Sequence, residues 1–250
     1  MKTGKKIKKV TVIILALAMI FGVFGISGME VTVKASDSPV KMYYCDHVLS
    51  YHGSVTVTVY VQVDSRSAVN RQVYIHHSGF GSGDWEDVEA AYCTKLDDNT
   101  EIWKATITGY ETSLEFAIKY IGDGKVYWDN NNGNNYTYNN VLGIANVKAG
   151  RLYKVYSSKV MMFATVKDLA YNKNVKVRYT TDNWETYKDE SLGYLSSIPN
   201  TNDELWSVEL DLDGGKTDGF HFCISYEVNG QTYWDNNFGA NFDLSYNCNR

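Results

Sequence analysis

Two tryptophans stand directly before runs of acidic and amide residues. Trp128 precedes Asp-Asn-Asn-Asn-Gly-Asn-Asn at 129–135, and Trp234 precedes Asp-Asn-Asn-Phe-Gly-Ala-Asn at 235–241. A flat aromatic face packs against the C–H face of a pyranose ring, and amide or carboxylate groups exchange hydrogen bonds with its hydroxyls. The pairing therefore indicates sites for sugar rings. The alternative is an ordinary turn, since Asn, Asp and Gly are common turn formers.

The strands before these tryptophans predict where the rings point. Segment 220–227 alternates apolar and other side chains, so its even positions are expected to face a core. Asn229-Gly230 is typical of a two-residue hairpin turn, which would pair Ser225 with Trp234 on the outer face. Asp123-Gly124 likewise predicts an outward Trp128. Turn chemistry explains the amide runs but not an exposed Trp before each of them.

Internal repetition sets the domain organisation. The six Trp form two sets of three in matching contexts: 84–86 with 183–185, 101–103 with 204–206, and 127–131 with 233–237. Alternating runs, 20 Tyr and the lack of long helical periodicity favour an all-β chain. We expect a first module over residues 36–146 and a second over 147–250. By strand phase, Trp103 and Trp206 are predicted to lie in the two cores.

The first Trp of each set lies in a polar loop. Trp85 follows Gly-Ser-Gly-Asp and Trp184 follows Thr-Thr-Asp-Asn. Each ring could extend a sugar-stacking surface, or it could be a loop anchor tucked over the edge of the module. Strand phase does not decide between the two.

The second repeat resembles carbohydrate-binding module family 21, through Val-Lys-Val-Arg-Tyr-Thr-Thr-Asp-Asn-Trp-Glu-Thr-Tyr-Lys-Asp at 175–189 and Tyr-Trp-Asp-Asn-Asn-Phe-Gly-Ala-Asn-Phe at 233–242. The family includes starch-binding domains of secreted amylases and glycogen-targeting domains of protein phosphatase 1 regulatory subunits. The first repeat looks like the same family, mainly through 114–136 and Trp85. The resemblance implies two tandem immunoglobulin-like β-sandwiches and α-glucan binding.

The resemblance also implies which residues contact sugar. One family site maps to Trp184 and Trp234 in the second repeat, and to Trp85 and Trp128 in the first. The Asp and Asn residues of the two amide runs are expected to hydrogen-bond the sugar hydroxyls. The candidate carbohydrate-binding residues are therefore Trp85, Trp128, Asp129, Asn130, Asn135, Tyr171, Trp184, Trp234, Asp235, Asn236 and Asn241. Tyr171 represents a second family site, whose counterpart near Val69 is missing in the first repeat. Cys223 and Ala117 stand where some members carry a further outward Tyr. We therefore expect the second repeat to bind better.

The N-terminus has the layout of a secretory signal peptide. Five lysines within the first nine residues precede an apolar run over 10–26, and Val-Lys-Ala at 33–35 offers a cleavage site. We expect cleavage after Ala35 and a secreted protein. The alternative is an uncleaved anchor, because the apolar run is nearly long enough to span a membrane, and only then would the protein contact one.

Charge and motifs narrow the function classes. Residues 1–35 hold six Lys and one Glu, so the remainder carries 18 basic and 28 acidic side chains, a net charge of −10. An acidic chain without a basic cluster is a poor nucleic-acid ligand. No carboxylate pair or nucleophile–base pattern stands out, so we expect no enzyme, no catalytic residue and no cofactor. Segment 129–140 lacks the closing Glu of a calcium loop, so no metal is expected.

The thiols and one glycosylation sequon leave questions open. Cys45, Cys93, Cys223 and Cys248 allow three pairings in an exported chain, including a staple between the first and last, and free thiols remain possible. Asn135-Tyr-Thr is a sequon whose glycan would obstruct the proposed sugar site.

The sequence thus predicts a secreted, non-catalytic protein that binds starch, glycogen or maltooligosaccharide. The alternative is an interaction or scaffold protein whose exposed aromatics dock a partner such as a secreted amylase or a surface complex. A glucan hydrolase would need catalytic carboxylates that the sequence does not point to.

Overall fold

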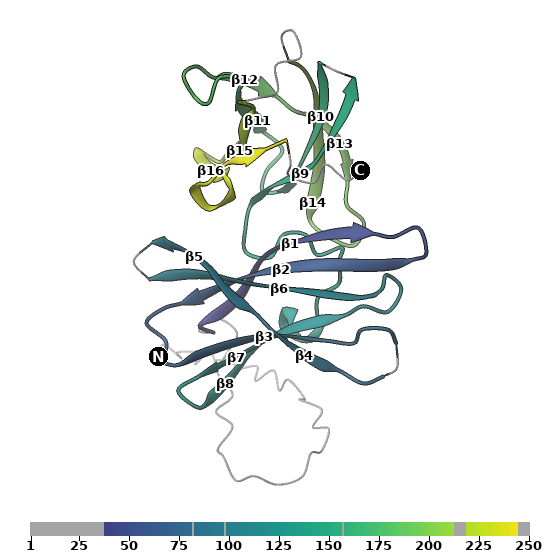
Figure 1. Cartoon of the computed structure of the whole chain (residues 1–250), viewed down its shortest axis with the longest axis vertical. Coiled ribbons are helices and arrows are strands. Elements are labelled where there is room, and N and C mark those ends of the chain that lie inside the picture. The colour runs from purple at the N-terminus through teal and green to yellow at the C-terminus, as the bar shows by residue number, and fades with distance from the viewer. Residues whose placement is uncertain (1–37, 82, 98, 157, 213–218, 245–250) are drawn as a thin grey trace, which may run out of the picture. The chain divides into compact units, whose positions relative to one another are not determined.

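The computed structural model of the chain describes residues 38–81, 83–97, 99–156, 158–212 and 219–244 (Figure 1). The expected signal peptide, its cleavage after Ala35 and Cys248 lie outside these residues. All described residues fall in one compact unit. In this part of the chain no helix is long and apolar enough to cross a membrane.

The described residues are all-β, as the alternating patterns predicted. The first half contains β1 (Val40–Leu49), β2 (Ser54–Asp64), β3 (Arg71–His77), β4 (Glu86–Glu89), β5 (Ala91–Asp97), β6 (Thr100–Tyr110), β7 (Phe116–Gly122) and β8 (Lys125–Asp129), followed by the short 3-10 turn η2 (Asn131–Gly133). The second half contains β9 (Val147–Tyr156), β10 (Lys159–Lys167), β11 (Lys173–Thr180), β12 (Lys188–Ser191), β13 (Gly193–Ser197), β14 (Asp203–Asp211), β15 (His221–Val228), β16 (Gln231–Asp235), η4 (Asn237–Gly239) and β17 (Phe242–Asp243).

The two halves share one strand order. The first half has sheets β1-β2-β6-β5 and β4-β3-β7-β8, and the second has β9-β10-β14-β13 and β12-β11-β15-β16, with β17 added beside β15. Each strand from β1 to β8 therefore has a counterpart eight places further along. The two halves therefore have matching strand topology.

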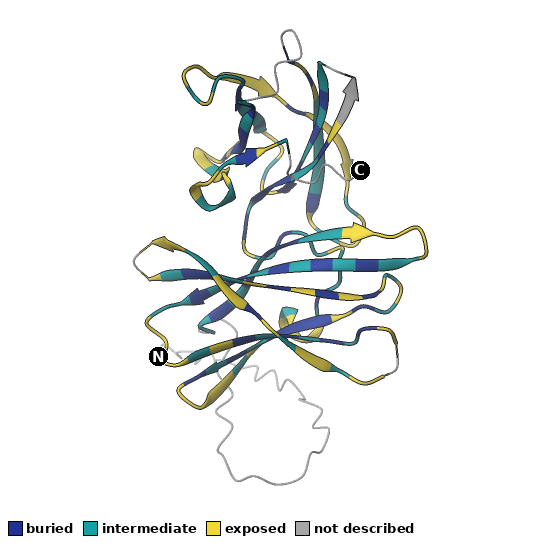
Figure 2. Cartoon of the chain, viewed as in Figure 1, coloured by how far each residue is buried: buried dark blue, intermediate teal, exposed yellow. Residues whose placement is uncertain are grey.

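Each half buries its own core between its two sheets. Burial alternates strictly along β2, where inward valines sit between polar neighbours (Figure 2). One cluster joins side chains of β1, β2, β3, β6 and β7, and another joins those of β9, β10, β11, β14 and β15. Trp103 and Trp206 pack half-buried against these clusters, and each indole N–H donates to a glutamate at 3.0 Å. Each half thus consists of two sheets packed around one core, and we refer to the halves as the first and the second sandwich.

The two hairpins have the predicted register. Tyr120 pairs with Tyr127 and Lys119 with Trp128 across the Asp123-Gly124 turn. Tyr226 pairs with Tyr233 and Ser225 with Trp234 across the Asn229-Gly230 turn. All four turn residues have positive φ, from 48° to 80°, which is the conformation of a type I′ turn. This register turns Trp128 and Trp234 outward, and their exposed fractions are 44% and 43%.

Candidate functional site

The two amide loops have the same local structure. The Asn130 Oδ1 accepts a hydrogen bond from the Gly133 N–H at 3.0 Å, and Asn236 Oδ1 accepts from Gly239 N–H at 3.0 Å. In each loop the next Asn donates through its side-chain amide to the backbone of the trailing Asn, at 2.9 and 3.0 Å. Turn chemistry therefore accounts for part of the amide content. The Nδ2 groups of Asn130 and Asn236 have no hydrogen-bond partner among the described residues.

The aspartates that open these loops turn inward. Asp129 accepts from the Met42 N–H at 2.7 Å and from the Tyr136 hydroxyl at 2.9 Å. Asp235 is 6% exposed and accepts from the Ala149 N–H at 2.6 Å, and its burial raises its pKa to about 6. Asp235 is therefore buried, whereas Asp129 stays half-buried beside Trp128, and contact of either carboxylate with sugar remains a prediction. The two carboxylates tie each loop to the first strand of its own sandwich, β1 or β9.

An aromatic row crosses the outer face of the first sandwich. The His76 ring lies stacked on Trp85 at 5.0 Å between centroids and meets Trp128 edge-on at 5.3 Å. Asp87 holds this row from β4, because it bonds His76 Nδ1 at 2.7 Å and the Lys119 ammonium at 2.6 Å. The structure therefore brings the two predicted tryptophans together through His76, which the sequence analysis did not single out.

The second sandwich carries a cation at the position of that histidine. Arg178 faces Cys223 across β15 just as His76 faces Ala117 across β7. Its guanidinium carbon lies 5.2 Å from the Trp234 ring centroid and 4.3 Å from that of Tyr187. Asp189 accepts two hydrogen bonds from this guanidinium, at 2.7 and 2.8 Å, which raises the pKa of Arg178 and lowers that of the carboxyl.

Trp184 lies in the loop that follows β11, half-buried and with a φ of 70°. The Thr180 Oγ1 accepts from its backbone N–H at 3.0 Å. The loop begins where β11 ends beside His221, and β17, which follows the amide loop, also pairs with His221. The topology therefore places Trp184, the amide loop and Trp234 at the same end of one sheet. No ring contact joins the two tryptophans among the described residues.

Tyr171 belongs to a different surface. It is 97% exposed in the segment before β11, which is the end of that strand opposite to the Trp184 loop. Its expected counterpart Val69 is also exposed, in the loop before β3. The structure therefore separates Tyr171 from the group that contains Trp234.

Sequence reasoning missed Arg178, Tyr187, His76 and Lys119 as parts of the two faces. A signal was available for two of them, because His76 and Arg178 both lie on the outward phase of a strand shortly before a loop Trp. The contacts of Tyr187 and Lys119 depend on how strands distant in sequence pair with one another. The alternation within a single strand does not predict that pairing.

Three cysteines lie among the described residues, and all three are free thiols. Cys45, Cys93 and Cys223 are not bridged to one another, and burial raises the pKa of Cys45 to about 12 and of Cys223 to about 11. Cys223 follows the outward phase of its strand, yet it is buried. No group of three His, Cys, Asp or Glu side chains among the described residues could hold a metal ion.

The comparisons with known proteins identify the second sandwich. Residues 146–245 match the model of the family described as carbohydrate/starch-binding module (family 21). The chain therefore carries one domain of this carbohydrate-binding family, and the segment matched is the sandwich that holds Arg178 and Trp234.

Individual relatives match over a similar length. Rat protein phosphatase 1 regulatory subunit 3C is 38% identical over 82 residues, which are 32% of this chain and 26% of the relative. Glucoamylase 1 of Rhizopus oryzae is 39% identical over 83 residues, which cover 32% of this chain and 13% of the enzyme. The chain thus spans about a quarter or less of these relatives.

Solved structures similar to this chain include the starch-binding domain of Rhizopus oryzae glucoamylase in complex with β-cyclodextrin and maltoheptaose. It has 30% sequence identity, and the match covers 40% of this chain and 92% of that domain with a TM-score of 0.35. The carbohydrate-binding module of the muscle glycogen-targeting subunit of protein phosphatase-1 has 26% identity, coverages of 40% and 74%, and a TM-score of 0.34.

Proposed function

We propose that the protein is a non-catalytic α-glucan-binding protein that uses the outer aromatic faces of both sandwiches. The family match over residues 146–245 carries this proposal, because the same residues place exposed Trp234 beside Arg178 and the amide loop. A half-exposed indole offers a stacking surface for a glucose ring, and Asn236 Nδ2 offers a donor beside it. Starch, glycogen and maltooligosaccharides present such rings in series.

The first sandwich is proposed as a second module of the same kind. Its strand order, its amide-loop bonds and its inward aspartate all repeat those of the second sandwich. Trp85, His76 and Trp128 form its candidate face. Two faces on one chain would bind a polymer more tightly than either face alone, because the second contact becomes intramolecular.

Export of the protein is a proposal that rests on its first 35 residues, through the lysine-rich head and the apolar run. N-terminal sequencing of protein recovered from the medium tests it. A sequence that starts at Ser36 is expected, and retention of the uncut chain in the membrane fraction would contradict it.

A pull-down on insoluble starch with residues 36–250 tests glucan binding. We expect the wild type to be retained, maltoheptaose to release it, and the Trp128→Ala/Trp234→Ala double variant to stay in the supernatant. Tyr51→Ala is the matched control, because Tyr51 is 99% exposed at the turn between β1 and β2. If folded wild-type protein remains in the supernatant, the proposal is wrong.

A second candidate function is partner targeting. Several relatives are named regulatory subunits of protein phosphatase 1, and they extend well beyond the matched segment. In this reading the sandwich would bring a protein partner to a glucan. Cross-linking to a phosphatase or an amylase in the presence of glycogen, but not in its absence, would favour it.

A further inference from the structure

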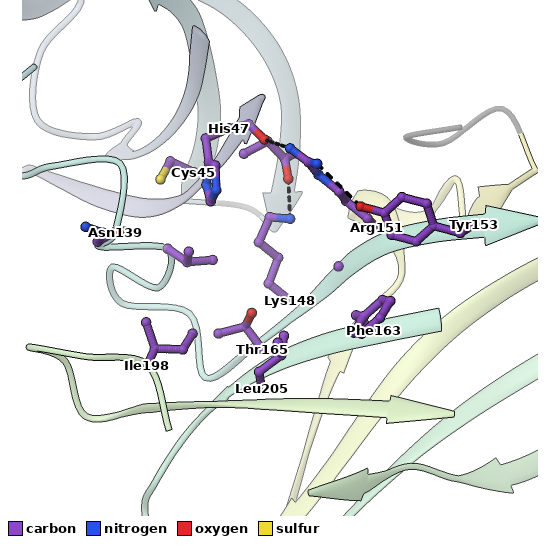
Figure 3. Close-up of a pocket in the computed structure, with 13 residues that line it drawn as sticks. Cys45, His47, Asn139, Lys148, Arg151, Tyr153, Phe163, Thr165, Ile198 and Leu205 are labelled. Carbon is purple, nitrogen blue, oxygen red and sulfur yellow. Dashed lines mark hydrogen bonds and ion pairs between the residues drawn. The ribbon is translucent and has the colours of Figure 1, made fainter. Parts of the chain in front are cut away.

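A cavity of about 330 Å³ is lined by residues of both sandwiches, away from the two aromatic faces (Figure 3). Cys45, Asp46 and His47 come from β1, and Asn139 and Val141 come from the segment that joins the two sandwiches. The other lining residues come from β9, β10, β14 and the turn after β13. Ligand pockets often lie where two such units meet, and this volume is at the small end of their range. The cavity therefore suits a small molecule and not an oligosaccharide.

One wall of the cavity is mostly apolar. Phe163 and Leu205 line it from the outer face of the β13-β14-β10-β9 sheet, with Thr165 as a polar neighbour on the same face. Ile198, which follows β13, and Val141, which precedes β9, complete it. The corresponding sheet of the first sandwich is different, because threonines cover part of the outer face of β2 and β6 as hydrogen-bonded pairs at 3.0 and 3.2 Å. An apolar outer face beneath a cavity offers a place for a hydrocarbon body.

The opposite side of the cavity carries positive charge. Figure 3 shows Lys148 and Arg151 extending from β9 toward the strand that carries His47. Lys148 has a 4% exposed side chain, pairs with Asp46 and donates to the Ala149 carbonyl at 2.8 Å. One carboxylate therefore balances its charge.

Arg151 has no such balance. Its guanidinium donates to the His47 carbonyl at 2.9 Å and to the Tyr153 hydroxyl at 3.4 Å, and it forms no ion pair within the described ranges. The pKa of His47 is lowered by burial first and then by the charges of Arg151 and Lys148. The polar side of the cavity thus has a net positive charge, and the two groups that accept hydrogen bonds from Arg151 are neutral.

We propose that this cavity binds a small monocarboxylate with an apolar tail, with the carboxylate at Arg151 and the tail against Phe163 and Leu205. Arginine presents a planar fork that matches a carboxylate, and hydrogen bonds to charged partners are stronger than neutral ones. A sugar would leave its hydroxyls against the apolar wall, which disfavours it here. The proposal does not depend on glucan binding at the aromatic faces.

Isothermal titration calorimetry of residues 36–250 with octanoate tests the proposal, with octanamide and maltose as comparison probes. We expect saturable one-to-one binding of octanoate that an excess of maltose does not displace, and at least about tenfold weaker binding of octanamide. Arg151→Gln should weaken octanoate at least about tenfold, and Arg66→Gln, at an exposed arginine of the first sandwich, should not. Leu205→Trp should block the cavity, whereas Leu96→Trp, at an exposed leucine of β5, should not.

Each outcome decides the assignment. Loss of octanoate binding in both cavity variants, with thermal unfolding and starch retention unchanged, supports it. Absence of saturable octanoate binding by the wild type overturns it, and so does binding that survives both variants. Loss in Leu205→Trp with full affinity in Arg151→Gln would mean an apolar pocket without carboxylate recognition, which overturns the ligand class. If Leu205→Trp does not fold, two measurements still decide the assignment: octanoate binding by Arg151→Gln, and octanamide binding by the wild type.

Discussion

Phe238 of the second amide loop stacks on Tyr44 of β1, with ring centroids 5.6 Å apart and planes inclined by 17°. Tyr43 and Tyr60 lie 5.6 and 5.7 Å from the same ring, so one side chain of the second sandwich sits among three tyrosines of the first. The matching position in the first loop is Asn132, which is exposed. The two loops have the same backbone conformation, but within the described part of the chain only the second contacts aromatic rings of the other sandwich.

Phe238→Ala is therefore expected to destabilise the protein and to loosen the second loop. A half-buried Phe should cost about 1–3 kcal/mol, less than a fully buried one. Urea unfolding measures this loss, and titration with maltoheptaose should show several-fold weaker binding. Asn132→Ala is the matched control and should change neither quantity. Equal behaviour of the two variants would mean that the stacking does not hold the loop.

Arg178→Lys is expected to weaken glucan binding about three- to tenfold without unfolding the sandwich. Lysine keeps the charge but loses both the fork that holds Asp189 and the planar stacking on Tyr187 and Trp234. Calorimetry with maltoheptaose in the Trp128→Ala background isolates the second face.

Arg66→Lys supplies the control for this change, because Arg66 also pairs with an aspartate, Asp64, but has no aromatic ring contact among the described residues. It should leave affinity unchanged. Since surface ion pairs contribute little, Arg178→Lys should lose less than about 1 kcal/mol of stability, and Arg66→Lys should unfold at the same urea concentration as the wild type. Unaltered affinity in Arg178→Lys would show that the guanidinium does not order the stacking rings.

Sequence patterns predicted the features that depend on residues close together in the chain. Alternation and the Asn229-Gly230 turn determined the strand phase, and that phase turned Trp234 outward as expected. The inward turn of Asp235 could not be predicted in this way, since its partner Ala149 lies 86 residues away. Tyr187 and Phe238 were missed for the same reason, because their ring contacts require strands or sandwiches to come together first.

The buried carboxyl of Asp235 predicts a pH dependence of stability. Its folded-state pKa, about 6, lies above the ordinary value near 4, so this group contributes stability below about pH 4 that is lost as pH rises through 6. Asp235→Asn stays neutral, and relative to it the wild type should lose about 2–3 kcal/mol between pH 4 and pH 7. Urea unfolding at several pH values measures the two slopes. Parallel slopes would show that Asp235 does not titrate in this range.

His77 predicts the opposite trend in the first sandwich. The residue is 2% exposed and neither ring nitrogen has a hydrogen-bond partner in the described structure. Its Nε2 lies 3.5 Å from a Glu86 carboxylate oxygen, but burial outweighs this exposed charge and lowers the pKa of His77. A base with a depressed pKa contributes stability above its ordinary value, near 6.5, that is lost as pH falls through the folded value. His77→Leu should lie within about 1 kcal/mol of wild type at pH 7.5 and become the more stable protein as pH falls to 5. A constant difference would contradict this.

Single-face variants predict how many binding sites the chain has. Maltotriose offers only three sugar rings, so we expect each molecule to occupy one face, and its titration should give two sites per wild-type chain and one site for either Trp128→Ala or Trp234→Ala. On insoluble starch the same single variants should each lose roughly tenfold or more in retention, because removing one face also removes the intramolecular second contact. Tyr51→Ala should keep both sites. One site in the wild type that disappears only with Trp234→Ala would restrict binding to the sandwich of residues 146–245, and the first sandwich would then need a different role.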